Sequence, residues 1–116
     1  MTYNDIVTAL KEAGVAVYHP GARAGVCTEP YAVVQMSGTY QYAASRRLGY
    51  TLVLVHCYAP LGNYPALALL VGRVKDALRP LLPDLRPTGN EGLHEINDTF
   101  RAHESTVEYL IQKKLF

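Results

Sequence analysis

Apolar positions concentrate in residues 49–82, where an unbroken apolar run passes directly into an amphipathic one. From Tyr50 to Tyr58 almost every residue is β-branched, aromatic or leucine, which predicts a central strand covered on both faces. Asn63 is a candidate N-cap, and Pro65 suits the first turn of the helix that follows. The apolar stripe of this helix, at three- and four-residue steps, is predicted to face the sheet. Its members are Leu67, Leu70, Val71, Val74, Leu78 and Leu81.

The N-terminal part alternates between regular elements and glycine-bearing turns. Residues 2–13 have an apolar face at helical spacing, and Gly14 follows them as a helix-ending glycine does. Residues 15–19 predict a short strand, and residues 21–30 a polar loop. Residues 31–37 predict a second strand, whose core face is formed by Ala32, Val34 and Met36.

Residues 38–47 are polar and rich in tyrosine and arginine, which predicts a hairpin loop before the central strand. Tyrosine and arginine are enriched at protein interfaces, so this loop is a candidate contact surface. A solvated hairpin tip is the alternative interpretation. The predicted interface residues are Tyr40, Tyr42, Arg46 and Arg47, together with Arg23 of the preceding loop.

The C-terminal part is less regular. Residues 83–92 hold two prolines and two glycines and predict a loop, and residues 93–100 a short strand. Residues 102–115 fit both a helical and an alternating pattern, and their β-branched content favours a strand. The expected fold is therefore a single α+β domain over residues 1–116, with two helices packed on a mixed, mostly antiparallel sheet of about four to five strands.

Composition limits the classes of function. The chain has 116 residues, 49% of them hydrophobic and 18% charged, which is typical of a globular domain. A formal charge of +1 does not favour a protein whose main task is to neutralise a phosphate backbone. No apolar run reaches the roughly 18 to 20 residues that cross a bilayer, and the N-terminal residues lack the charged-then-apolar pattern of a signal peptide. We therefore expect a soluble protein with no membrane partner.

The sequence contains no familiar catalytic, phosphate-binding or metal-binding motif. His56 and Cys57 are neighbours on a predicted strand, so their side chains point to opposite faces and do not suit one metal ion. Cys57 is expected to be reduced and packed, and no disulfide with Cys27 is indicated. His94, Asp98 and His103 lack a convincing further ligand. We therefore expect no enzyme activity, no metal and no cofactor.

The order of the expected elements resembles the tail terminator (tail completion) proteins of long-tailed bacteriophages. Three passages carry the resemblance: SRRLGYTLVLVHCYAP, YPALALLVGRVKDAL and RAHESTVEYLIQKKL, the last with the pattern A-x-x-x-x-V-x-Y-x-I-x-K. The resemblance implies a hexameric ring that caps the finished tail tube and meets the head-neck connector. It implies a virion protein assembled in the host cytoplasm, with DNA passing through the lumen and attracted only weakly. It carries over no catalytic residue.

Two other functions remain open at this stage. One is another head-tail neck protein, such as a head completion or stopper protein of similar size. The other belongs to a different class, a small enzyme or ligand-binding domain with a pocket near Cys57, His56 or His94.

Overall fold

The protein has one mixed, mostly antiparallel sheet of six strands and two α-helices, which confirms the predicted α+β class with more strands than expected. The computed structural model describes residues 2–22, 25–41, 47–92 and 94–114. In chain order the elements are α1 (Tyr3–Glu12), β1 (Val17–Tyr18), β2 (Tyr31–Gln41), β3 (Leu48–Pro60), α2 (Tyr64–Leu78), the short 3-10 helix η1 (Arg79–Leu81), β4 (Leu85–Glu91), β5 (Glu95–Asn97) and β6 (Ala102–Lys114).

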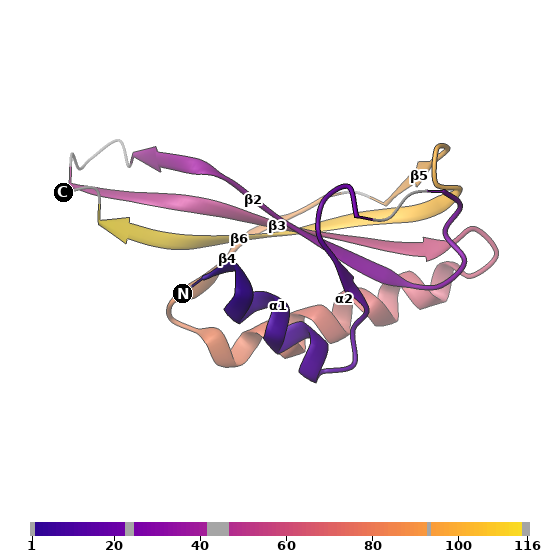
Figure 1. The fold of residues 1–116 in the computed structure, drawn as a ribbon, viewed down its shortest axis with the longest axis horizontal. Helices are drawn as coiled ribbons and strands as arrows, with labels where there is room; N and C mark the ends of the chain where they lie inside the picture. The colour runs from indigo at the N-terminus through magenta and orange to yellow at the C-terminus, as the bar shows by residue number, and fades with distance from the viewer. Residues whose placement is uncertain (1, 23–24, 42–46, 93, 115–116) are drawn as a thin grey trace.

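The three long strands form the middle of the sheet (Figure 1). The strand order is β1-β2-β3-β6-β4, with β5 paired to β6, so β3 is central as predicted. β3 pairs antiparallel with β2 on one side and along its whole length with β6 on the other. β1 pairs parallel with β2 through two residues only. The strand prediction for residues 102–115 is thus confirmed over Ala102–Lys114.

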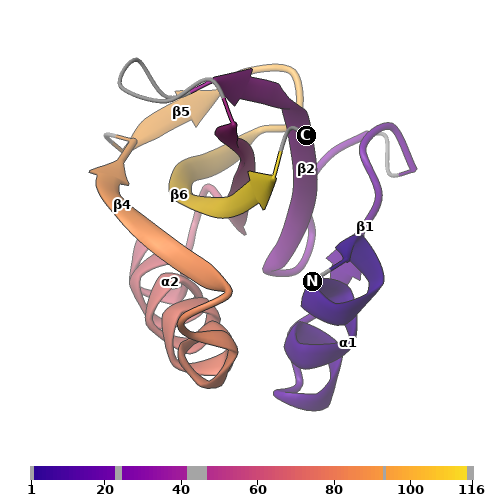
Figure 2. The same ribbon diagram turned by 90° about the vertical axis from the view of Figure 1, so that its left-hand side faces the viewer.

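Both helices cover the same face of the sheet (Figure 2). α1 ends where predicted, with Gly14 at φ +82°, a conformation that glycine adopts without a steric cost. Asn63 is the N-cap of α2, and its side chain accepts a hydrogen bond from the backbone N–H of Ala66. The predicted stripe faces the sheet, with four members buried and Val71 half-buried in α2, while the half-buried Leu81 lies in η1 beyond the end of the helix. The buried four are Leu67, Leu70, Val74 and Leu78.

Two loop predictions are wrong. Residues 85–91, inside the loop predicted for 83–92, form β4 at the edge of the sheet. An edge strand tolerates Pro87, and its pairing with β6 is irregular around Gly89, at φ +87°. The loop predicted for residues 38–47 is also too long, because β2 continues to Gln41 and β3 begins at Leu48. Residues 42–46 lie outside the described residues.

The molecule is elongated, with extents of 47 × 27 × 24 Å. β2, β3 and β6 project past both helices at one end of the long axis (Figure 1). We call the outer parts of these strands, residues 37–41, 48–54 and 110–114, the arm; its inner residues Val53 and Ile111 still belong to the core beneath the helices. Within the described part of the chain, neither helix combines the length and apolar character needed to span a membrane.

Candidate protein interaction surface

The central strand is covered on one face along most of its length. From Thr51 to Cys57 every second residue is buried, and the residues between them are half-buried. Val53, Val55 and Cys57 belong to the core cluster that the helices cover. The prediction that this strand is covered on both faces therefore holds only at its end, where Cys57, Tyr58 and Ala59 are buried in succession. The second face carries apolar side chains that no described helix covers.

At that covered end, a small second cluster packs on the face opposite the helices. The Tyr31 and Tyr58 rings stack with centroids 5.0 Å apart, and Phe100 meets Tyr58 edge-on at 5.9 Å. The Cys27 backbone N–H donates to the Phe100 carbonyl at 2.7 Å, which holds the loop before β2 against the turn before β6. Ala102 completes this cluster. On the face opposite the helices, the sheet is therefore covered by loops, and only at the end of β3 that holds Tyr58.

Towards the arm, the same face presents apolar residues to its surroundings. The register places Leu52 beside Leu110 and Tyr50 beside Tyr40, so these side chains share a face. The Tyr40 and Tyr50 rings lie 5.5 Å apart. Tyr40 is 45% and Leu48 39% exposed, and the other members are half-buried. We call this surface the arm patch: Tyr40, Leu48, Tyr50, Leu52, Leu54 and Leu110.

The predicted interface residues are only partly described. Tyr40 lies in the arm patch, and its hydroxyl is 3.2 Å from the Ser37 hydroxyl. Arg47 is exposed and directly precedes β3. Tyr42, Arg46 and Arg23 lie outside the described residues.

The leucines of the arm patch are not among the predicted interface residues, because an unbroken apolar strand predicts cover on both faces. The usable signal is the apolar run itself, which places Leu48, Tyr50, Leu52 and Leu54 at every second position.

Polar residues separate the arm patch from the covered end. The His56 ring bridges β2 and β6, with Nδ1 2.9 Å from the Thr106 hydroxyl and Nε2 2.9 Å from Gln35 Oε1. Because the amide oxygen only accepts, Nε2 carries the hydrogen of a neutral ring. Burial lowers the pKa of His56, and the charge of Glu104 partly opposes that effect. His56 is therefore a structural residue that prefers its neutral form.

We expect His56 to make stability fall as the pH drops below its ordinary pKa of 6.5. The folded-state pKa is lowered, so the unfolded chain takes up the proton more readily. The contribution of His56 to the stability of the fold is complete above the pKa that the histidine has in the unfolded chain. It is lost as the pH falls toward the pKa of His56 in the folded protein. Thermal melts between about pH 8 and about pH 5 should show a steeper loss for the wild type than for His56→Gln. His19→Gln, at an exposed histidine, is the control, and equal slopes for wild type and His56→Gln would contradict the expectation.

The fold brings together two of the three residues considered for metal or acid-base chemistry. His94 Nε2 lies 2.7 Å from His103 Nδ1, and His103 Nε2 lies 3.0 Å from the Leu61 carbonyl oxygen. The Tyr64 ring meets both imidazoles edge-on. Asp98 is exposed in the turn after β5. Among the described residues no group of three or more metal-ligating side chains forms. The two histidines are thus held by each other, by Tyr64 and by a backbone carbonyl.

Both cysteines are free and buried, as predicted for Cys57. Burial raises the pKa of the Cys57 thiol to about 12, so the thiolate is not populated near neutral pH. Cys57 lies on the helix-covered face and His56 on the other, which confirms that the pair does not converge. The arrangement does not activate Cys57 as a nucleophile.

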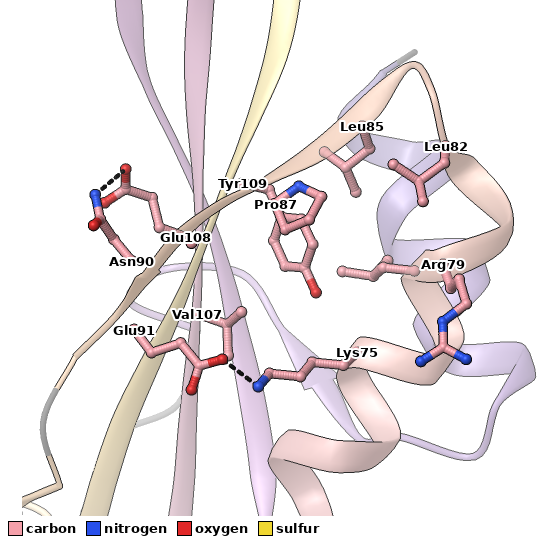
Figure 3. A pocket seen from close by; sticks show the side chains of 12 residues that line it. Lys75, Arg79, Leu82, Leu85, Pro87, Asn90, Glu91, Val107, Glu108 and Tyr109 are labelled. Carbon is pink, nitrogen blue, oxygen red and sulfur yellow. Dashed lines mark hydrogen bonds and ion pairs between the residues drawn. The ribbon is translucent and has the colours of Figure 1, made fainter.

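A cleft of about 260 Å³ lies between α2 and β4 (Figure 3). Its walls include Leu82, Leu85 and Tyr109, and burial raises the pKa of Tyr109 to about 12. An ion pair between Lys75 and Glu91 crosses it from α2 to β4. Neither Cys57, His56 nor His94 lines this cleft. This cleft therefore differs from the pocket expected for a small enzyme or ligand-binding domain, whereas two open hollows of about 300 Å³ and about 220 Å³ are lined by His94 and by His56, respectively.

No protein-family model matches the chain, and no curated protein is significantly similar to it. Sixteen chains of solved structures show significant similarity. One of them is 19% identical, with 100% of both chains covered and a TM-score of 0.46. Similarity at this level carries no information about function.

Proposed function

We propose that this chain is a tail terminator protein of a long-tailed bacteriophage, which caps the tail tube as a ring and joins it to the head-neck connector. The observation that carries the proposal is the arm patch, an apolar surface on three strands that project beyond the helices. Two of its six members are exposed and four are half-buried, and an apolar surface left accessible to this extent supports a role in protein association. The sequence resembles the terminator family, and this resemblance indicates that the association would occur in the ring at the end of the tail tube.

The proposed mechanism is docking, with no bond made or broken. Leucine and tyrosine side chains of the arm patch would be buried against a neighbour, and burial contributes about 25 cal/mol per Å² of apolar area. The formal charge of +1 fits a protein that DNA passes without tight binding. The proposed location is the head-tail junction of the virion, after assembly in the host cytoplasm.

Growth of purified tail tubes tests the proposal. Added to elongating tube protein, the chain is expected to stop growth and to appear as a ring at one tube end in electron micrographs. Tubes that elongate unchanged, with no chain bound at their ends, would refute the proposal. Cross-links to the portal side without any to the tube would instead identify a head completion or stopper protein.

A further inference from the structure

A second exposed apolar surface lies at the opposite end of the long axis from the arm. It gathers around His103. The Nε2 atom of His103 forms a hydrogen bond with the Leu61 carbonyl, and its ring contacts the Tyr64 ring. On the neighbouring strand β5, His103 is paired with Ile96. Leu61 is 44%, Tyr64 51% and Ile96 56% exposed. Figure 1 shows β5 and the turn after β3 at one end and the arm at the other. We call Leu61, Tyr64 and Ile96 the turn patch.

The two ends carry opposite charge. Arg47 directly precedes β3 at the outer end of the arm, and the register places Lys113 and Lys114 on β6 opposite Gly49 and Leu48. The sequence has no acidic residue between positions 38 and 52 or between 109 and 116. The arm end is therefore basic.

At the turn end, Glu95 and Asp98 are exposed in and after β5, and Glu104 is half-buried on the neighbouring strand. Residues 94–104, which form this end, contain three acidic residues and one arginine, Arg101. This end is acidic. Each end thus combines apolar side chains with a charge that complements the other end.

We propose that copies of this chain bind head to tail, with the arm patch and basic strand ends of one copy on the turn patch and acidic β5 end of the next. An interface between two different surfaces is heterologous, and it produces a ring when the rotation closes. Apolar contact supplies affinity, while opposite charges set the orientation and suppress arm-to-arm pairing. The inference rests on the proposed function, because it names the two surfaces that build the terminator ring.

Charge reversal on each end tests the contact. Arg47→Glu and Glu95→Arg are each expected to weaken self-association about tenfold or more, since each places like charges across the interface. The double variant restores an opposite pair and is expected to recover most of the loss. Sedimentation velocity over a concentration series, with light scattering for mass, measures the association of the purified chain.

Lys11→Glu, an exposed charge reversal on α1 away from both patches, is the matched control and should associate like the wild type. Raising the salt should weaken the wild-type contact, because exposed charges are screened over a Debye length of about 10 Å at about 0.1 M. A wild type that stays monomeric, single variants that behave like Lys11→Glu, or a double variant without recovery would each overturn the inference.

This experiment contains no tube protein, so it separates the inference from the proposed function. A chain that associates through these ends but leaves tube growth unchanged would refute the terminator proposal alone. A chain that caps tubes while the charge variants associate normally would refute the head-to-tail contact alone.

Discussion

Replacing Leu78 by alanine is expected to lower the free energy of unfolding by about 2–5 kcal/mol. Leu78 is the last buried residue of the α2 stripe, and its side chain is 1% exposed. It belongs to the main core cluster with Leu85 of β4, so truncation would open a cavity where the helix meets the sheet edge. Urea unfolding at one fixed protein concentration measures the loss.

Leu69→Ala is the matched control on the same helix. Leu69 is 72% exposed, so the same chemical change should alter stability by no more than about 0.5 kcal/mol. Similar losses for Leu78→Ala and Leu69→Ala would show that α2 does not pack on the sheet through its predicted stripe.

Replacing Leu48 and Leu52 together by glutamine is expected to weaken self-association about a hundredfold and to abolish binding to tube ends. Fully burying one leucine contributes about 1.5–3 kcal/mol to the free energy of association. The loss of two buried leucines is therefore sufficient to weaken association about a hundredfold. Glutamine is neutral, so the basic character of the arm is unchanged. Sedimentation velocity and electron microscopy of tubes measure the two effects.

The control for this pair is Val26→Gln combined with Leu69→Gln. Val26 and Leu69 are 53% and 72% exposed and belong to neither patch. Association reduced equally in both double variants would show that general surface polarity, and not the arm patch, governs assembly. Thermal melts of both variants verify that each remains folded.

Local signals in the sequence were sufficient for the helices and the long strands. The stripe of α2 and its Asn63 cap depend on residues within a few positions of one another, and both are confirmed. β4 was missed because Pro87 and Gly89 are typical of loops. Only its place at the sheet edge, a property of the whole fold, makes these residues compatible with a strand.

The arm patch shows a different limit of the sequence. An apolar residue at every second position of a strand predicts that a face will be buried, but it does not say which chain provides the cover. For Val53 and Val55 the cover is the protein's own helices. For Leu48 and Leu52 no described helix provides it, and only the fold shows which face of the strand the helices cover.

The pairing of β6 with three other strands has a consequence for biosynthesis. β3, β4 and β5 all pair with β6, which follows them along the chain. Before Ala102 and the residues after it are synthesised, β3 lacks its partner β6. The backbone edge of β3 is then unpaired and open to pairing with neighbouring nascent chains. Folding must then wait for late translation, and we expect chaperones that bind emerging polypeptides to protect β3 until β6 arrives.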